Sequence, residues 1–370
     1  MIRVGFRLIG GVAWQGGRNY LWNLLHAVSV LPARTIQPVL LLGPGDAAGD
    51  LPAETFVTDA RFDSANTRRA GRLLKLASGR NLVELAWLRR ARIDVVSHAQ
   101  PVGRVPTIAW VPDVQHRRLP HMFSQRERIM RDLMFREIVR DAAIVVTSSE
   151  TARADLQRFY GASDARCRVL RFVSQPRGVA TVATTALAVP PRFFHLPNQL
   201  WKHKNHLLVV EALAQVPEAI VVATGPREDY RHAGMYDQLM ARVRELGLGD
   251  RFLHLGLVEF ADLVALMRRS VAVINPSRFE GWSTTVEEAK SLGKRVLVSD
   301  IPVHHEQDPP RARYFDVDDP TALAALMREA WATHDPEADA RAAAAAAAAL
   351  PERTRAFGET YQAIVREVAR

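Results

Sequence analysis

The sequence predicts an α/β protein made of two doubly wound domains. Its 370 residues exceed the usual size of a single domain. Short β-branched runs alternate with helix-like stretches along the first half, and the same alternation starts again after residue 191. This order favours parallel sheets that are covered by helices on both faces.

The N-terminal domain is expected over residues 1–173. Its expected strands are 2–8, 37–42, 93–97, 107–111, 143–147 and 168–173. Its expected helices are 19–29, 124–140 and 150–160. Ser148 and Ser149 precede the last of these helices, and serine is a favoured N-cap residue.

Residues 174–191 lack an amphipathic period and end on Pro190 and Pro191, so we predict an interdomain linker there. A second Rossmann-like domain is expected over 192–352. Its expected strands are 193–196, 219–223, 252–255, 271–274 and 295–299, and its expected helices are 205–215, 235–246, 260–269 and 285–292. The eight alanines 342–349 indicate another helix, because alanine has the highest helix propensity. An amphipathic C-terminal helix within 353–370 is expected to pack back on the N-terminal domain.

The sequence favours a cytoplasmic protein, either free or at the inner face of the plasma membrane. No apolar run reaches the roughly 18 residues that a membrane span needs. The first residues resemble a strand more than a signal peptide, because they lack a long apolar region and a cleavage site. The single cysteine, Cys167, cannot form an internal disulfide and favours a reducing compartment.

The net charge of +9 comes from 49 basic and 40 acidic residues. The excess is concentrated in two clusters, which contain Arg68, Arg69, Arg72, Lys75, Arg80, Arg89, Arg90 and Arg92, and then Arg117, Arg118, Arg126, Arg128 and Arg131. Leucines and Trp87 are interleaved with the first cluster. The stretch Arg68–Arg92 is therefore either a contact with an anionic membrane surface, at roughly 1 kcal/mol per basic residue, or a solvated helix face. No nucleic-acid partner is expected, because no RNA- or DNA-binding module is recognisable.

Two glutamates, Glu280 and Glu288, follow the strand expected at 271–274. Glu280 lies on the loop after that strand, and Glu288 lies in the first turns of the next helix. Ligands bind at the carboxyl ends of strands in open α/β sheets, and a helix N-terminus offers N–H groups to a phosphate. One carboxylate can therefore bind sugar hydroxyls and the other a ribose, with a diphosphate between them. The alternative is that Glu288 forms a capping box with Thr285.

A polar loop follows the strand that ends at Leu196. It places Lys202 and Lys204 before the next helix, where their compact positive charges can meet a diphosphate. His203 and His206 lack a third ligand at metal-binding spacing, so no metal site is expected.

These segments together resemble the family 4 retaining glycosyltransferases of GT-B fold, above all the bacterial members that build lipopolysaccharide, capsule and exopolysaccharide. The matching segments are Gly10–Gly11, Gly16–Asn19, Pro112–Pro120, Thr147–Glu150, Asn198–His206, Thr224–Gly225, Leu246–Arg251, the Glu280 and Glu288 pair, Asp300–Glu306 and Tyr314–Pro320. Their order covers nearly the whole chain. The resemblance implies two Rossmann-like domains that face a cleft.

The resemblance also implies an activity: transfer of a sugar from a nucleoside diphosphate to a glycan or lipid-linked glycan hydroxyl, with the anomeric configuration retained. The implied catalytic residues are Glu280, Lys204, Asp113 and His116. The implied donor-binding residues are Gly16, Gly17, Asn198, Gln199, Lys202, Thr224, Gly225, Arg278, Gly281, Trp282, Ser283, Thr284, Thr285 and Glu288. No cofactor and no metal are implied.

Three positions depart from the family pattern. Gln199 replaces an arginine of many relatives, so Lys204 is expected to carry more of the leaving-group charge, helped by Lys202 or Arg278. Pro112 and Asp113 replace a His-Asp pair, and His116 is the nearest substitute. Residues 282–285 replace a more apolar segment with one rich in hydroxyl groups.

The donor and the class of activity leave alternatives. Family habit favours a GDP-mannose-like donor over dTDP-rhamnose or a UDP-sugar. A sugar phosphorylase is disfavoured, because no lysine for a pyridoxal cofactor stands out, whereas a nucleotide-sugar epimerase stays open. A non-catalytic nucleotide-sugar binder or membrane scaffold is the alternative from another class, and the set of Lys204, Glu280 and Glu288 argues against it.

Overall fold

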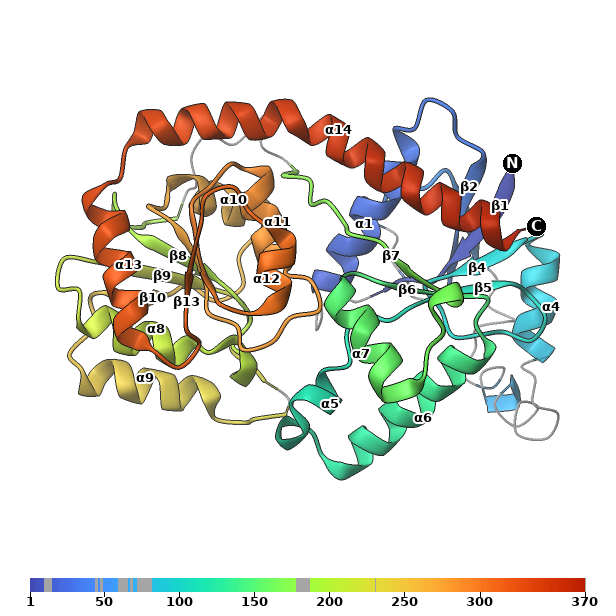
Figure 1. Ribbon diagram of the computed structural model, residues 1–370, viewed down its shortest axis with the longest axis horizontal. Coiled ribbons are helices and arrows are strands. Elements are labelled where there is room, and N and C mark those ends of the chain that lie inside the picture. Colours follow the sequence, from blue (N-terminus) through green and yellow to red (C-terminus); the bar gives the residue numbers. More distant parts are fainter. Residues whose placement is uncertain are drawn as a thin grey trace. The chain divides into compact units, whose positions relative to one another are not determined.

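The computed structural model describes residues 1–9, 15–43, 46, 49–58, 66, 69–71, 82–177, 187–229 and 231–369. The chain forms two compact units, whose elements are labelled in Figure 1. Unit 1 comprises 1–120, 124–173 and 352–370, and unit 2 comprises 121–123 and 174–351. The described part of 174–191, where we expected a linker, is grouped with unit 2.

Unit 1 is built on a parallel sheet. Its strands, among the described residues, are β1 (Ile2–Phe6), β2 (Ile36–Leu42), β3 (Thr55–Thr58), β4 (Val95–Ser97), β5 (Thr107–Trp110), β6 (Ile144–Thr147) and β7 (Cys167–Val169). Their order is β3-β2-β1-β4-β5-β6-β7, and every pairing is parallel. The order reverses between β1 and β4, so the carboxyl ends of these two strands are the natural ligand-binding edge of this sheet.

Helices pack on this sheet, and the longer ones do so through an apolar face. They include α1 (Gln15–Ser29), α4 (Leu82–Arg90), α5 (Gln115–Arg118), α6 (Gln125–Asp141) and α7 (Glu150–Tyr160). Phe135 and Ile138 of α6 pack with Leu156 of α7 against Val145 of β6. Spacings of three and four residues place such side chains on one face of a helix. Ser124 and Glu127 form a capping box that fixes the start of α6.

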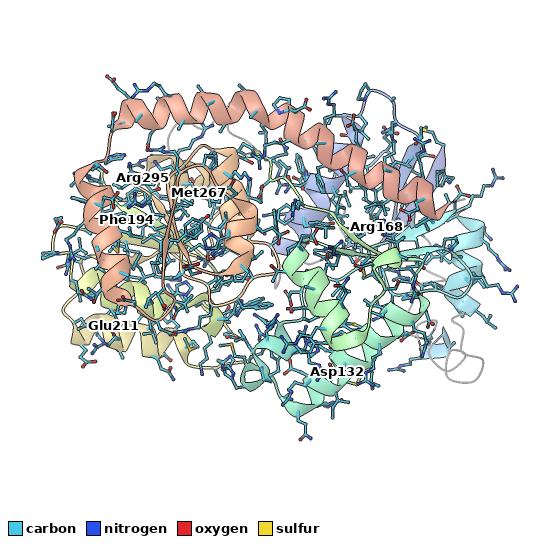
Figure 2. All side chains as sticks on the ribbon, in the orientation of Figure 1. Asp132, Arg168, Phe194, Glu211, Met267 and Arg295 are labelled. Carbon is cyan, nitrogen blue, oxygen red and sulfur yellow. The ribbon has the colours of Figure 1, made fainter. Side chains whose placement is uncertain are left out.

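The end of the last helix, α14 (Pro336–Val368), belongs to unit 1. Phe357, Tyr361, Ile364 and Val365 are buried there. The hydroxyl of Tyr361 donates to Ser97 Oγ at 2.7 Å, and Arg168, labelled in Figure 2, pairs with Glu367 at 2.5 Å. The sequence predicted a helix over the alanine run and a separate one at the end. The structure instead has one continuous helix with Pro351 inside it.

Unit 2 contains a second parallel sheet. Its strands, within the described ranges, are β8 (Phe194–Pro197), β9 (Val221–Thr224), β10 (Phe252–His254), β11 (Val273–Asn275), β12 (Val296–Ser299) and β13 (Ala312–Phe315). Their order is β10-β9-β8-β11-β12-β13. The chain builds outward from β8 to one edge and then returns to β11 to build the other. The strand order therefore reverses between β8 and β11.

Two layers of helices enclose the sheet of unit 2. The helices are α8 (His206–Ala214), α9 (Met235–Glu245), α10 (Phe260–Arg269), α11 (Thr284–Ser291), α12 (Pro302–Gln307) and α13 (Pro320–Ala332). Ile274 of β11 packs in the cluster of α8, α9 and α13 with Phe194, whereas its neighbour Val273 packs with Met267 of α10 and Val286 of α11. Successive side chains of a strand point to opposite faces, so the two clusters lie on opposite faces. Figure 2 labels Phe194 and Met267.

The predicted fold class, two doubly wound α/β domains, is confirmed. Two strands were not predicted: β3 and β13, which each lie at an edge of a sheet and have four residues. An edge strand pairs on one side only, so β3 keeps two exposed residues and β13 carries Arg313. Neither shows the apolar run that marks the central strands. Within the described residues, no helix has the length and apolar character of a membrane span.

Replacement of Gly358 by alanine tests the packing of α14 in unit 1. A Cβ atom there would collide with the backbone carbonyl of Ala27 on α1. The gain in helix propensity, about 1 kcal/mol, is smaller than the cost of forcing two backbones apart, about 1–3 kcal/mol. We expect Gly358→Ala to lower the urea midpoint of unfolding. Gly249→Ala is the matched control, because its Cβ would meet nothing within 4 Å; equal midpoints for the two variants would contradict this account.

Candidate functional site

Two loops meet where the strand order of unit 2 reverses. One follows β8 and the other follows β11. Lys204 on the first loop and Glu280 on the second form an ion pair, with 2.6 Å between Nζ and Oε1. In the first loop, a short 3₁₀ turn (Lys202–Lys204) leads to Asn205, whose φ of 57° is left-handed. Asparagine is among the few residues that adopt this conformation readily. The sheet topology thus brings together two residues that are 76 positions apart.

The ion pair is mostly withdrawn from water. The side chains of Lys204 and Glu280 are 15% and 9% exposed. Burial alone would raise the pKa of Glu280, but the charge of Lys204 and the hydrogen bond that Lys204 donates hold that pKa below its usual value. Glu280 is therefore a carboxylate at neutral pH. A buried charge that loses its partner is costly, so each residue depends on the other.

Hydrogen bonds fix the loop after β11. The side-chain amide of Asn275 donates to Ser283 Oγ at 2.6 Å, and the hydroxyl of Ser277 donates to Asn275 Oδ1 at 2.7 Å. The N–H of Arg278 donates to the carbonyl of His203 at 2.8 Å. This last bond ties the two loops together beside the ion pair.

The structure corrects the capping interpretation of Glu288. The N-cap of α11 is Ser283, whose hydroxyl accepts from the N–H of Val286. Thr285 lies inside the first turn, and its hydroxyl donates to the carbonyl of Pro197. A capping box between Thr285 and Glu288 is therefore wrong, because the helix starts two residues earlier than that box requires.

Glu288 is buried inside unit 2. Burial raises the pKa of its carboxyl group to about 8, although the guanidinium of Arg177 acts in the opposite direction. A carboxyl group in such a position is held ready for a hydrogen-bonding partner rather than for a surface ion pair. This is a common property of groups at functional sites.

The loops after β8 and β9 pack directly against each other. Gly225 has a φ of 134°, and a Cβ atom there would collide with the carbonyl of Asn198. Only glycine suits this position, because its backbone conformation is unfavourable for other residues and the carbonyl of Asn198 leaves no room for a side chain. The hydroxyl of Thr224 lies 3.0 Å from His195 Nε2. Thr224 and Gly225 thus shape the site, and Gln199 is half-buried beside Asn198.

Three buried polar atoms on the loops after β8 and β11 and on α12 have no hydrogen-bond partner among the described residues. They are Asn198 Nδ2, Trp282 Nε1 and His304 Nε2. His304 Nδ1 lies 2.8 Å from the carbonyl of Ser299, so the ring donates there and leaves Nε2 as an acceptor. Buried polar groups without partners are rare in folded proteins. Two donors and one acceptor in this state are available to a polar ligand.

The remaining predicted donor-binding residues of unit 2 differ in whether their polar groups already have partners within the protein. The side chain of Lys202 is exposed, whereas the guanidinium of Arg278 is 2.5 Å from Asp318. The N–H of Ser283 donates to Gln307, so it is already used. Thr284 and Thr285 contribute the first N–H groups of α11, and Gly281 is buried beside Trp282.

The predicted residues of unit 1 occupy two places. Gly16 and Gly17 lie in the first turn of α1, and Gly10 and Gly11 fall outside the described residues. Asp113 Oδ1 accepts from the N–H of Gln115, at the start of α5. His116 is buried: its Nε2 lies 3.0 Å from Asp132 Oδ1 and 2.8 Å from the hydroxyl of Tyr160.

His116 therefore joins α5, α6 and α7; Figure 2 labels its partner Asp132 on α6. Burial lowers the pKa of His116, although Asp132 acts in the opposite direction. The catalytic assignment of Asp113 and His116 stays a prediction.

Half of the basic residues in the stretch Arg68–Arg92 lie within the part of the chain that the structure describes. Arg68, Arg72, Lys75 and Arg80 lie outside the described residues. In the described part, Leu85, Trp87 and Leu88 are buried, and the last two pack on β2 and β4 with Val39 and Val96. These apolar side chains belong to the core and are not available to a membrane.

One buried residue of the site was missed by sequence analysis. Asp229 accepts from the N–H groups of Lys202 and Arg231, and it pairs with the ring of His232. It thereby connects the loop after β9 to the loop that carries Lys204. Its spacing to Lys202 carries no recognisable motif, so no sequence signal could have identified it.

No metal site is recognisable in the described ranges, where no three His, Cys, Asp or Glu side chains are grouped to hold an ion. Burial lowers the pKa values of His203 and His206 to about 3, so both rings are neutral. They are core histidines.

Replacement of Glu288 by glutamine tests its burial. The folded-state pKa of about 8 lies above the value of 4.5 for an exposed glutamate. The folded chain therefore holds the proton more tightly, and stability is lost as pH rises through about 8. Glutamine cannot ionise, so the melting temperature of Glu288→Gln relative to wild type should increase from about pH 6 to about pH 9. Parallel curves of melting temperature against pH would show that Glu288 does not titrate in this range.

Comparisons with known proteins agree with this architecture. The family "Glycosyl transferases group 1" matches residues 184–348. The O-antigen chain mannosyltransferase RfbU of Salmonella typhimurium is 26% identical over 223 residues, 60% of each chain. The lipopolysaccharide core biosynthesis mannosyltransferase LpcC of Rhizobium leguminosarum is 36% identical over 98 residues, 26% of this chain and 27% of that protein.

A solved structure extends the similarity to both units. The HepE protein of Anabaena, in complex with UDP and glucose, has a TM-score of 0.70 at 16% identity, covering 99% of this chain and 100% of that chain. The curated relatives are matched over less than two thirds of their own length. At these levels of similarity, the chain has the GT-B fold, and its residues 184–348 match the glycosyl transferases group 1 family.

Proposed function

We propose that this protein is a retaining glycosyltransferase of family 4 that acts in the synthesis of a cell-surface polysaccharide or lipopolysaccharide. The observation that carries the proposal is the Lys204 and Glu280 ion pair at the point where the strand order of unit 2 reverses. This is where ligands bind in open α/β sheets. A fold alone does not specify an activity, so the proposal depends on the residues of this site.

The residues of unit 2 suit the parts of a nucleoside diphosphate sugar. Lys204 offers an ammonium group to the diphosphate, together with the first N–H groups of α11 at Thr284 and Thr285. Glu280 is a carboxylate that can accept hydrogen bonds from sugar hydroxyls. Glu288, at the far end of the same segment, is assigned to the ribose. The buried donors of Asn198 and Trp282 and the acceptor of His304 offer further partners.

The proposed reaction exchanges one bond at the anomeric carbon for another. The bond between that carbon and the β-phosphate oxygen breaks, and a bond to the acceptor oxygen forms on the same face. The acceptor proton passes to the departing phosphate oxygen. The protein supplies fixed positive charge where negative charge develops, which is an efficient form of catalysis. We propose that Lys204 supplies this charge without a metal ion.

The donor is proposed to be GDP-mannose-like. The two curated relatives are named mannosyltransferases, one of the O-antigen chain and the other of lipopolysaccharide core biosynthesis. The HepE structure holds UDP and glucose, which favours a UDP-sugar as the alternative, with dTDP-rhamnose as a third. The proposed acceptor is a hydroxyl of a glycan or lipid-linked glycan. Asp113 and His116 of unit 1 are assigned to the acceptor or the donor sugar. Work at the inner face of the cytoplasmic membrane would suit such an acceptor.

A non-catalytic nucleotide-sugar binder is the alternative from another class. It would need the ribose and phosphate contacts but not a charged carboxylate beside the sugar. The ionised Glu280 favours the enzyme. Slow hydrolysis of one nucleotide sugar by the purified protein would also favour the glycosyltransferase. Conversion of one nucleotide sugar into another would instead indicate an epimerase.

The role of Glu280 can be tested by mutation. Glu280→Ala should reduce the transfer rate at least about tenfold, because the carboxylate that holds the sugar is lost. Glu280→Gln keeps the shape of the side chain and removes its charge, so it should lose most of the activity. It should also melt at a lower temperature than wild type, because Lys204 stays buried without an anionic partner. The measurement is initial rate with a radiolabelled nucleotide sugar.

Glu245→Ala is the matched control for these variants. Glu245 pairs with Arg242 on the exposed surface of α9, within the same unit. The initial transfer rate of Glu245→Ala should stay close to that of wild type. A folded Glu280→Ala variant with nearly wild-type rate would remove Glu280 from the mechanism.

Nucleotide binding should depend on pH through Glu288. Ribose hydroxyls donate to a carboxylate, so binding should expel the proton that Glu288 holds below pH about 8 and should tighten as pH rises towards that value. Calorimetry with GDP, UDP and dTDP in buffers of different ionisation enthalpy measures both affinity and proton release. GDP should bind most tightly. Proton release that persists in Glu288→Gln would contradict the assignment to Glu288.

A further inference from the structure

A cavity of about 260 Å³ lies in unit 2 between α13 and the amino-terminal ends of β12 and β13. The strands of this sheet are all parallel, and the proposed donor site lies at the carboxyl ends of β8 and β11. The cavity therefore lies at the opposite edge of the sheet from the proposed donor site. A ligand in this cavity would bind apart from the reacting groups.

Three arginines line this cavity: Arg295, Arg311 and Arg313. Leu297 and Phe315 pack in the apolar cluster that includes α13. Arg295 lies two positions before Leu297. Arg311 and Arg313 lie four and two positions before Phe315. Because alternate residues of a strand point to the same face, the sheet gathers three guanidinium groups on the face that α13 covers; Figure 2 labels Arg295.

Two carboxylates pair with the other cations at this cavity. Glu329, on α13, pairs with Arg313 at 2.9 Å. Asp339, in the first turn of α14, pairs with Arg311 at 2.8 Å and also with the buried Lys294. Three cations therefore share two carboxylates before Arg295 is counted.

Arg295 forms an ion pair with neither of these carboxylates. Its guanidinium donates to the carbonyl of Ala330 at 3.4 Å and to the hydroxyl of Thr333 at 3.0 Å. Burial lowers the pKa of Arg295, and the charge of Arg311 acts in the same direction. Burial also lowers the pKa of His334, so its ring adds no charge at neutral pH. Among the lining residues and their ion-pair partners, four cations thus face two carboxylates, an excess of two positive charges.

Neighbouring charged side chains that do not line the cavity have partners elsewhere. Asp335 and Glu337, before and in the first turn of α14, both pair with Arg341. The guanidinium of Arg328 on α13 donates to the carbonyl of Gln215. The positive charge at the cavity wall is therefore left to a ligand.

The rest of the cavity wall is apolar. It is formed by Leu297, Pro310, Ala312, Leu326 and Ala330. The volume is slightly below the range of about 300–1,000 Å³ that is usual for sites of drug-sized ligands. The cavity therefore suits a small molecule that has a charged end and a compact body.

We propose that this cavity binds a small phosphate monoester through Arg295, Arg311 and Arg313. A guanidinium presents paired N–H donors that match the oxygens of a phosphate. A phosphate monoester carries about −1.5 to −2 charge at pH 7, which corresponds to the excess of positive charge at the wall. The apolar residues contact the body of the ligand. The proposed function assigns no ligand to this edge of the sheet.

The test is calorimetric titration of the purified full-length protein with glycerol 3-phosphate. Wild type should bind this probe, should bind it less tightly as salt is added, and should not bind glycerol. Inorganic phosphate should bind more weakly than glycerol 3-phosphate, because it cannot contact the apolar wall. Equal affinity for the two anions would overturn the assignment to a monoester.

Two substitutions at the cavity should have opposite effects. Arg313→Gln should weaken binding of glycerol 3-phosphate at least about tenfold, because a charged hydrogen-bond donor is lost. Glu329→Gln should tighten binding about two- to fivefold, because it frees Arg313 and removes negative charge from the wall. Both side chains are about half exposed, so neither change should alter the melting temperature much. A merely structural ion pair would not produce tighter anion binding when it is broken.

Two control variants separate this site from others. Arg328→Gln removes a guanidinium from the same helix, next to Glu329 but outside the cavity, and should bind the probe like wild type. Lys204→Gln combined with Glu280→Gln removes both charges of the proposed donor site together and should also leave the affinity unchanged. Failure of this inference and failure of the proposed function are therefore distinguishable.

Three further outcomes would overturn the inference. One is a wild-type protein that does not bind glycerol 3-phosphate. Another is a folded Arg313→Gln variant, with the circular dichroism of wild type, that binds the probe as well as wild type does. The third is loss of binding in the folded Lys204→Gln and Glu280→Gln variant, because the probe would then occupy the donor site.

Discussion

The ion pair between Lys204 and Glu280 joins the two halves of the second sheet where its strand order reverses. On both sides of this pair, apolar packing determines the arrangement of strands and helices, because the strands are buried and the helices cover them. At the pair itself, charge dictates the structure, because neither residue tolerates this degree of burial without the other. The bond from the N–H of Arg278 to the carbonyl of His203 holds the two loops at the separation that the pair requires. A diphosphate would bring a second anion to Lys204, so protein and ligand would share one cation.

Much of the fold follows from the sequence, because the central strands are buried on both faces and appear as runs such as Val271–Ile274. Glu280 and Lys204 each follow such a run, so both could be placed at the carboxyl ends of strands, but the ion pair between them was not predicted. The cap of α11 could not be predicted. Thr285 and Glu288 have the spacing of a capping box, but Ser283 is fixed as N-cap by Asn275 and Gln307, which come from other elements. Asp229 escaped detection for a similar reason, since one of its partners is the N–H group of Lys202 on another loop.

Charge clusters in the sequence were the weakest guide to which side chains the folded protein exposes. The sequence of Arg68–Arg92 and that of α6 both mix arginine with large apolar residues. Burial separates them, because Trp87 and Leu88 face β2 and β4 whereas Ile129 and Leu133 face water. Which side of a helix meets the sheet depends on the register of the whole unit.

The assignment of residues 352–370 to unit 1 has a consequence for synthesis on the ribosome. The core of unit 1 includes Phe357, Tyr361 and Ile364, which emerge only after all of unit 2 has been translated. Multidomain chains usually fold their N-terminal domain first. In this chain the last step of that order is reversed. All residues of unit 2 have been synthesised before unit 1 is complete. Until the end of α14 is synthesised, part of the surface of unit 1 stays uncovered. A nascent chain of this protein therefore depends longer on protection from aggregation at its beginning than at its middle.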